Sequence, residues 1–230
     1  MLKVVKSLQA NEVELLGLDI RSANFPNAAW LPDNIAFAVW DAYNELPAEY
    51  EGAFDVVHLR ALYSTVIDNK VDALLANCLK MLTPGGFLQW DESDASTLAC
   101  YTPADDFNAT ACKQIIALQE FSARTFTKMT PDWLRNLPTT LEGQGCNVIV
   151  HGEFDPDKRL ARAWTDNVLL VWRSMVALMP EKEMPLPPGM GLPEKLSKAH
   201  FAELLREPIE ETKQGVMLGM RCHVHVAKKA

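Results

Sequence analysis

Short apolar runs that end in acidic or polar residues recur through the first part of the chain. Three of them, at residues 14–20, 35–40 and 54–59, are too short for helices and are apolar on both sides. Such runs are typical of strands covered on both faces, as in a parallel sheet. A fourth run, at residues 86–90, follows a turn signal, Thr-Pro-Gly-Gly, at residues 83–86. The pattern predicts a mostly parallel sheet.

Apolar residues at spacings of three and four predict helices between and after these strands. The spacing is clearest at residues 71–82, where Val71, Leu74, Leu75 and Cys78 share one side. Thr130 followed by Pro131 predicts a helix N-cap. Helices are predicted at 71–82, 104–127, 131–144, 160–179 and 196–205, strands at 146–150 and 215–227, and a proline-rich surface loop at 180–193. Alternating strands and helices favour an α/β fold.

Composition and charge narrow the class of protein. The chain has 230 residues, 48% of them hydrophobic, which suits one globular domain. A formal net charge of −8 argues against a nucleic-acid partner. Five scattered cysteines form no C-x-x-C pair, which favours a reducing compartment. Without a signal peptide or a bilayer-length apolar stretch, we expect a cytoplasmic protein with no membrane partner.

Several motifs in this order resemble the fungal class I S-adenosylmethionine-dependent methyltransferases of secondary metabolism. They are Gly-Leu-Asp-Ile at 17–20, Trp-Asp-Ala at 40–42, FDVVHLR at 54–60 and LTPGGFLQWDE at 82–92. The last two form a fairly specific pair, and the resemblance covers residues 13–94 well and the rest loosely. It implies a three-layer αβα Rossmann-like sheet with a helical insertion or lid. It also implies methyl transfer from S-adenosyl-L-methionine to a small-molecule natural product.

The resemblance implies roles for residues at the strand ends, where a doubly wound sheet binds its ligands. Asp19, followed by Ile20, is implied to accept hydrogen bonds from the ribose hydroxyls of the cofactor. Asp41 and Ala42 are implied to hold the adenine, and His58 to lie near the methionine part. Acids after parallel strands also cap the turn or helix that follows. That alternative stays open for each acid, and a purely local role stays open for His58.

The acceptor is expected beyond the strand that ends near Trp90, covered by the helical insertion. The candidates for orienting or deprotonating the acceptor are Asp91, Glu92 and Arg60. The candidates for lining an apolar substrate pocket are Tyr63, Trp90, Phe126 and Trp133. Turn capping is the alternative for the acids, and core packing is the alternative for the aromatic residues.

We interpret residues 1–230 as one methyltransferase-like domain with three parts. Residues 1–94 are the cofactor-binding part, 95–145 the helical insertion, and 146–230 the C-terminal strands and helices. The family's first strand and glycine-rich loop are expected roughly 20 residues before the ribose acid. Counting back from Asp19 reaches Met1, and residues 2–11 contain no glycine.

We therefore expect an N-terminally truncated sheet without the central strand between the Asp19 strand and the His58 strand. Each orphan buried amide at such edges costs about 1–3 kcal/mol. Residues 2–5 are a candidate replacement strand, and an exposed edge also favours a homo-oligomer.

Other readings remain open at this point. His223 and His225 share one side of a strand, as metal ligands do, but no third ligand is near in sequence, so no metal is expected. A truncated, non-catalytic methyltransferase-like protein that acts as a binding or regulatory partner is an alternative, and a methyltransferase-like cyclase is another. The sequence names neither the acceptor, nor the methylated atom, nor the oligomeric state. It also leaves open whether the cofactor binds without the glycine-rich loop and whether the chain is a fragment of a longer protein.

Overall fold

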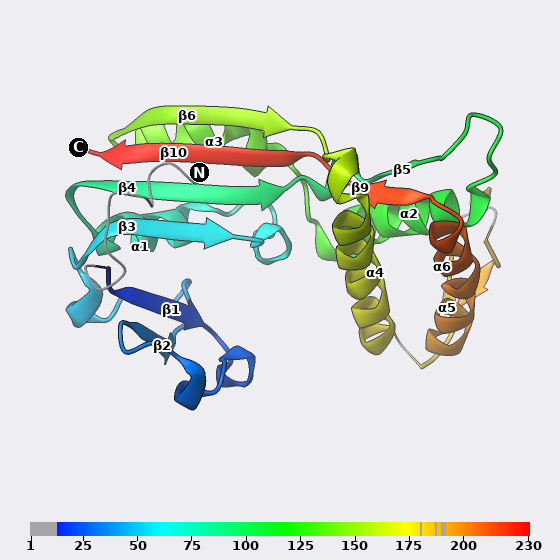
Figure 1. Cartoon of the computed structure of the whole chain (residues 1–230), viewed down its shortest axis with the longest axis horizontal. Coiled ribbons are helices and arrows are strands. Elements are labelled where there is room, and N and C mark those ends of the chain that lie inside the picture. Colours follow the sequence, from blue (N-terminus) through cyan, green and yellow to red (C-terminus); the bar gives the residue numbers. More distant parts are fainter. Residues whose placement is uncertain (1–12, 180, 187, 190–191) are drawn as a thin grey trace.

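The computed structural model describes residues 13–179, 181–186, 188–189 and 192–230. Its main sheet has the strand order β3-β4-β10-β6, and β1 and β2 form a separate pair (Figure 1). The strands of the main sheet are β3 (Phe54–Arg60), β4 (Leu82–Ser93), β6 (Cys146–Phe154) and β10 (Cys222–Lys229). β3 and β4 are parallel, whereas β10 is antiparallel to both β4 and β6. The chain therefore has an α/β fold built on a mixed sheet.

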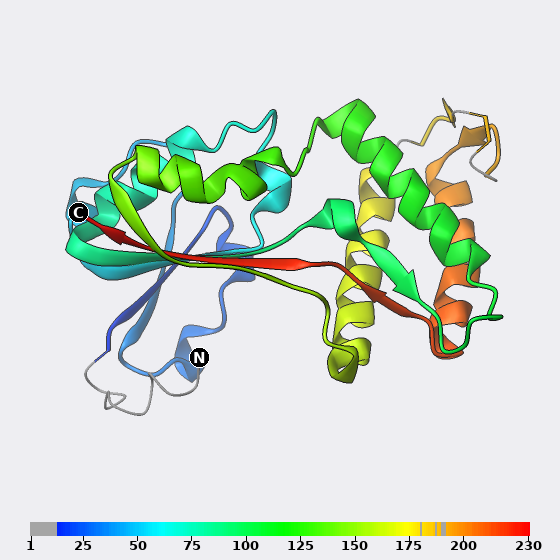
Figure 2. The same cartoon turned by 90° about the horizontal axis from the view of Figure 1, so that it is seen from above.

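Two helices cover one face of the main sheet. α1 (Asp72–Met81) packs against β3 and β4, and α3 (Asp132–Gly143) packs against β6 and β10. Seen from above, both helices lie on one side of the sheet and the β1–β2 pair lies on the other (Figure 2). In the described part of the chain no helix packs against the second face. The second helical layer of the expected three-layer arrangement is therefore not part of the described structure.

The alternation of side chains along β4 explains why one face is buried. Leu88, Trp90 and Glu92 point toward the helices and are at most 3% exposed. The residues between them, Gln89 and Asp91, face the open side. The core under the sheet is completed by leucines of α1 and α3, namely Leu74, Leu75, Leu134, Leu137 and Leu141.

The β1–β2 pair is detached from the main sheet. β1 (Leu15–Asp19) runs parallel to β2 (Ile35–Val39), with Asp19 opposite Val39. A Cβ at Gly17 would overlap the ring of Phe37, so this side chain would have to move if β1 carried a larger residue there. Among the described residues β1 pairs only with β2 and β3 only with β4. The sheet is thus divided at the place where the family's first strand is expected. The candidate replacement strand at residues 2–5 lies outside the described residues.

Side-chain hydrogen bonds connect the β1–β2 pair to the main sheet. Asn77 Nδ2 of α1 donates to the carbonyl oxygens of Ala42 and Asn44, at 2.8 Å each. Tyr43 donates its hydroxyl proton to the carbonyl oxygen of Thr65 at 3.0 Å. The loop after β2 is therefore held by α1 and by the loop after β3.

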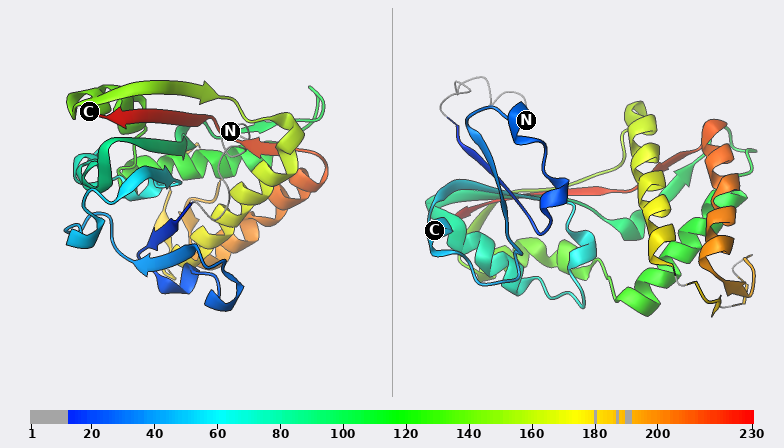
Figure 3. Two further views of the ribbon diagram at one scale, coloured as in Figure 1. Left: turned by 60° about the vertical axis from the view of Figure 1, so that its left-hand side comes forward. Right: turned by 90° about the horizontal axis from the view of Figure 1, so that it is seen from below.

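A second hydrophobic core lies beyond the carboxyl end of β4, and Figure 3 shows it as a separate lobe. Its centre contains Ile115, Trp172, Phe201 and Leu218, all at most 2% exposed. Its elements are α2 (Thr110–Ser122), α4 (Ala161–Leu178), α5 (Lys198–Leu204), α6 (Arg206–Lys213), β5 (Ala99–Tyr101) and β9 (Met217–Gly219). A short pair, β7 (Met184–Pro185) and β8 (Lys195–Leu196), lies in the segment predicted as a loop. In the described part of the chain, no helix is both long and apolar enough to cross a membrane.

Several predicted boundaries differ from the structure. The helix predicted at 104–127 begins at Thr110 and ends in a π-helical turn, Ala123–Thr127. The strand predicted at 215–227 is two strands, β9 and β10, which pair in different sheets. β5 and α6 were not predicted. The segment predicted as a helical insertion divides, since α2 lies in the second lobe and α3 packs on the main sheet.

The predicted N-cap at Thr130 is also wrong. The Trp133 backbone N–H at the start of α3 donates to Asn69 Oδ1 at 3.0 Å, and the Thr130 hydroxyl donates to the same oxygen at 2.7 Å. The cap is a tertiary contact from the loop before α1, which a local sequence rule does not reach.

Neighbouring leucines of α4 test the second core. Leu169 is 9% exposed and Leu170 is 63% exposed. Leu169→Ala is expected to lower the free energy of unfolding by about 2–5 kcal/mol, because it removes buried methyl groups and leaves a cavity. Leu170→Ala should change it by no more than about 0.5 kcal/mol. Urea unfolding measures both, and equal effects would contradict the burial of this face of α4.

Candidate active site

The carboxyl ends of the parallel strands bring the predicted polar residues to one edge. The arrows of β1, β3 and β4 point toward the same side of the molecule (Figure 1). Asp19 ends β1, Asp41 follows β2, Arg60 ends β3, and Asp91 lies near the end of β4. This edge is where open α/β sheets bind ligands.

Asp19 caps its own turn and keeps one oxygen free. Its Oδ1 accepts hydrogen bonds from the Arg21 backbone N–H at 2.8 Å and from Asn24 Nδ2 at 3.2 Å. No bond from the described residues reaches Oδ2. Turn capping and ligand binding are therefore compatible here. Ile20 beside it is 60% exposed, so its apolar side chain is open to a ligand.

Asp41 repeats this arrangement at the next strand. Its Oδ1 accepts from the Tyr43 backbone N–H at 3.0 Å. Since Asp19 lies opposite Val39, Asp41 lies two residues farther in the strand direction. The carbonyl of Ala42 is used by Asn77, which leaves its backbone N–H as the group available to a ligand.

His58 and Asp91 form a hydrogen-bonded pair on the open face of the main sheet. His58 Nε2 lies 2.9 Å from Asp91 Oδ2, and their side chains are 47% and 22% exposed. Gln89 Nε2 donates to both oxygens of Asp91, at 3.1 and 3.0 Å. A carboxylate so held keeps the Nε2–H tautomer of the imidazole and leaves Nδ1 as a proton acceptor. Arg60 lies directly opposite Asp91 in the ladder.

The sequence did not single out Gln89, although a signal for it exists. Gln89 and Asp91 are two residues apart on a strand, so they share a face. In the structure this polar pair lies beside His58, and Asp91 is hydrogen-bonded to both Gln89 and His58.

Glu92 lies on the opposite face of β4 and is 3% exposed. Its Oε2 accepts from the Leu62 backbone N–H at 2.6 Å, and its Oε1 from the Ser93 N–H at 3.0 Å. Burial raises the pKa of Glu92, and these hydrogen bonds oppose the shift without cancelling it. Glu92 thus fixes the loop after β3, where Ala61 has a positive φ of 57°. Its surroundings match the turn-binding alternative.

The aromatic candidates gather under the sheet rather than at its open face. The ring centroids of Trp90 and Trp133 are 5.2 Å apart, and those of Tyr63 and Trp133 are 6.2 Å apart. Trp90 and Trp133 are at most 3% exposed, so both lie in the core. Tyr63 is half-buried, and burial raises its pKa to about 12. The Phe126 side chain lies outside the described residues.

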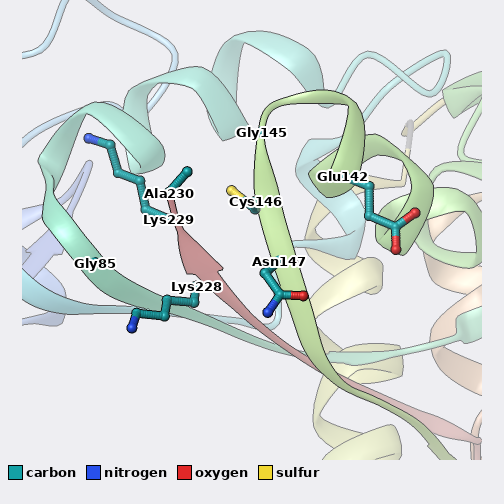
Figure 4. A pocket seen from close by; sticks show the side chains of 8 residues that line it. All are labelled: Gly85, Glu142, Gly145, Cys146, Asn147, Lys228, Lys229 and Ala230. Atoms are coloured by element: carbon teal, nitrogen blue, oxygen red, sulfur yellow. The ribbon is translucent and has the colours of Figure 1, made fainter.

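A hollow of about 600 Å³ lies at the other end of the main sheet (Figure 4). It is lined by Gly85, Glu142, Asn147 and Lys228, among others, near the start of β4 and the end of β10. The ammonium group of Lys229 there donates to the carbonyl oxygens of Leu79 and Leu82, at 2.8 Å each. The predicted residues at the strand ends do not line this hollow.

The hydrogen-bond acceptors at the strand ends are suited to the nucleoside part of S-adenosylmethionine. Asp19 Oδ2 and Asp41 Oδ2 are charged acceptors suited to ribose hydroxyls and to an amino group. Among the described residues, no glycine-rich loop brings backbone amides to the amino-acid end of the cofactor. Within the same residues, no group of three or more metal-ligating side chains has a geometry that could hold a metal ion.

Known proteins with similar sequences agree with the resemblance seen in the motifs. No protein-family profile matches the chain. Over 88 residues it is 35% identical to Methyltransferase grgD of Penicillium sp, which covers 38% of this chain and 30% of that protein. Over 85 residues it is 32% identical to N-methyltransferase verN of Clonostachys rogersoniana, covering 37% and 30%. The matched segment is similar to fungal methyltransferases. It spans less than a third of these relatives.

Solved structures give a weaker likeness. The [4+2]-cyclase SpnF is 13% identical, with a TM-score of 0.49 over 98% of this chain and 69% of that one. Phosphoethanolamine N-methyltransferase 2 of Haemonchus contortus is 14% identical, with a TM-score of 0.49 over 96% and 45%.

The buried carboxyl of Glu92 should make the free energy of unfolding depend on pH. Because burial raises its folded-state pKa above 4.5, the folded chain holds this proton more tightly than the unfolded chain. The stability of the wild type relative to Glu92→Gln should therefore be highest below pH 4.5 and fall as the pH rises toward the folded-state pKa.

Urea unfolding between acidic and neutral pH measures this difference. Glu49→Gln, at an exposed position, is the matched control and should show no such trend. A difference between wild type and Glu92→Gln that grows with pH would contradict the raised pKa.

Proposed function

We propose that the protein takes part in S-adenosylmethionine-dependent methyl transfer to a small-molecule acceptor. The observation that carries the proposal is the 35% identity to a fungal methyltransferase over 88 residues. The acids at the ends of β1 and β2 support it, since each keeps one carboxylate oxygen for a ligand.

In this proposal the strand ends of β1 and β2 bind the nucleoside. Asp19 accepts from the ribose hydroxyls, Ile20 packs beside them, and Asp41 with the Ala42 N–H holds the adenine. When bound, the cofactor supplies an electrophilic sulfonium methyl group. Alignment of the acceptor with that methyl group is then the main requirement of the reaction.

The open face of the main sheet supplies the proton acceptor. His58 Nδ1 takes the proton of an acceptor O–H or N–H, while its Nε2–H donates to Asp91. Arg60 orients the acceptor from the neighbouring strand end. Glu92 keeps its place in the proposal as the group that holds the loop after β3.

The setting that we propose is fungal secondary metabolism in the cytoplasm. Support comes from the fungal relatives. All five cysteines are free, as in a reducing compartment.

Binding of S-adenosylhomocysteine tests the cofactor site. At a hundredfold excess over its dissociation constant it should add about 2.7 kcal/mol, which raises the melting temperature by about 5–10 °C. Asp19→Asn should abolish most of this rise, because it removes the charge but keeps an oxygen for the turn. Thermal melts of both chains measure the effect.

Asp33→Ala is the matched control, since Asp33 is an exposed acid in the loop before β2. A cooperative melt that S-adenosylhomocysteine leaves unchanged would overturn the proposed cofactor site.

Replacement of His58 tests the proton acceptor. For an acceptor that must lose a proton, His58→Asn is expected to lower kcat by about 10²- to 10⁴-fold. Binding of S-adenosylhomocysteine should stay unchanged. The rate is measured by transfer of a labelled methyl group to a panel of hydroxylated and amino small molecules. An unchanged kcat would remove His58 from the reaction.

The divided sheet favours a second candidate, a non-catalytic methyltransferase-like protein that acts as a binding or regulatory partner. The division between β1 and β3 separates the proposed nucleoside residues from the proposed proton acceptor. Cofactor binding without any methylated product would support this candidate over the first.

A further inference from the structure

Three histidines lie in a row across β6 and β10, away from the candidate active site. His151 of β6 lies directly opposite His225 of β10, and His223 lies two residues along β10 on the same face. The ring centroids are 5.0 Å apart for His151 and His225 and 6.0 Å apart for His225 and His223. Both pairs are stacked, at 24° and 21°. We call these residues the histidine row.

The inner members of the histidine row are buried and incompletely hydrogen-bonded. His223 and His225 are each 1% exposed. His223 Nδ1, His223 Nε2 and His225 Nε2 are buried without a hydrogen-bond partner among the described residues. Burial, together with the neighbouring His151 and His223, lowers the pKa of His225 to about 4. Burial also lowers the pKa of His223.

One hydrogen bond joins the two strands within the histidine row. His151 Nδ1 lies 3.2 Å from His225 Nδ1, so one ring must donate its N–H and the other must accept. If both rings carry two protons, two N–H groups face each other and the bond is lost. Two like charges would then also stack at 5.0 Å.

The charged groups around the histidine row only partly offset this effect. Asp94 Oδ2 and Glu153 Oε1 each lie 3.9 Å from His223 and favour its charged form. Each acid already has a cationic partner, since Arg135 of α3 pairs with Asp94 and Arg221 pairs with Glu153.

On β4, Glu92 lies opposite His223, but the Leu62 and Ser93 backbone N–H groups hold its carboxylate. Trp90, which carries no charge, lies opposite His225. His225 thus has no carboxylate on its own cross-strand positions.

The histidine row lies on the two strands that connect the main sheet to the second lobe. Among the described strands β6 pairs only with β10 and so forms an edge, and the chain leaves it for α4 of the second lobe. β10 enters the main sheet directly from β9, which belongs to that lobe. We propose that the histidine row is a pH-sensitive contact, which holds β6 on β10 in neutral solution and weakens this pairing on acidification.

The sign of the effect follows from linkage. Unfolded histidines take up protons near pH 6.5, whereas His223 and His225 in the folded chain resist protonation to a lower pH, since burial lowers the pKa of both. Stability is therefore complete above pH 6.5 and is lost as the pH falls toward the folded-state pKa. His225, whose folded-state pKa is about 4, should lower the folding equilibrium constant about tenfold between pH 7 and pH 5.5, and His223 adds to the loss in the same direction.

Urea unfolding of the full chain at pH 7 and pH 5.5 is the first test. His225→Phe keeps the ring stack and removes one titrating group. The fall in the folding equilibrium constant from pH 7 to pH 5.5 should therefore be about tenfold smaller than in the wild type. His200→Phe, at an exposed position of α5, should leave the loss unchanged. Equal losses in wild type and His225→Phe would overturn the proposal.

Amide hydrogen exchange locates the change. At pH 5.5, after correction for intrinsic rates, protection should fall in β6 and β10 before it falls in α2 and α4. If protection fell at the same time in β6, β10, α2 and α4, the histidine row would not act locally on the β6–β10 pairing, and the proposal would be overturned. If His225→Phe does not fold, His151→Phe at the exposed end of the histidine row serves instead, together with an NMR titration of the wild-type rings. A His225 ring that titrates near pH 6.5 would also overturn the proposal.

Discussion

The twelve-residue strand β4 is the element on which the rest of the structure depends. It pairs with β3 on one side and with β10 on the other, so its register fixes both ladders. Alternation along it sends Trp90 and Glu92 into the core and Gln89 and Asp91 to the open face. A slip of one residue would reverse every one of these positions. The same strand therefore holds the core together and aims the proposed proton acceptor.

The division between β1 and β3 splits the candidate site into two parts that no described strand pairing connects. No described strand pairs across the division, so within the described structure the β1–β2 pair is held by the hydrogen bonds of Asn77 and Tyr43 and by partly buried apolar contacts. Regions with few buried contacts open at low free-energy cost. In the proposed function the nucleoside lies on one side of the division and the proton acceptor on the other. A ligand that contacts both would therefore stabilise their relative placement.

Buried polar groups join the two lobes. Asp94, 1% exposed, ends β4 by accepting from the Ser96 N–H, and it pairs with Arg135 of α3 at 3.2 Å. His223 lies 3.9 Å from Asp94 and 3.9 Å from Glu153, and Arg221 connects Glu153 to the chain entering from the second lobe. Breaking one partner of such a network leaves a buried charge uncompensated, which is costly. The stability of this junction therefore depends on the charge of its members, and in our proposal the protonation of the histidine row makes it depend on pH.

The sequence by itself determined the strands at residues 15–19, 35–39 and 54–60, the helix under the sheet and the α/β class. These follow from local apolar period and turn chemistry, which act over a few residues. It also placed Asp19 and Asp41 at strand ends, because a strand end is a local feature, whereas Asp91, expected after a strand at residues 86–90, lies inside β4.

Only the tertiary structure decided what each of these side chains touches. Asn69 caps α3 from a distant loop, Gln89 and Asp91 meet His58 across a ladder, and Glu92 and Trp90 turn inward with the register of β4. The predicted closing strand became two because its halves pair with different lobes. The row of three histidines appears only when residues 151 and 225 are brought opposite each other. Such contacts depend on register and on packing between segments far apart in the chain, and no local pattern encodes them.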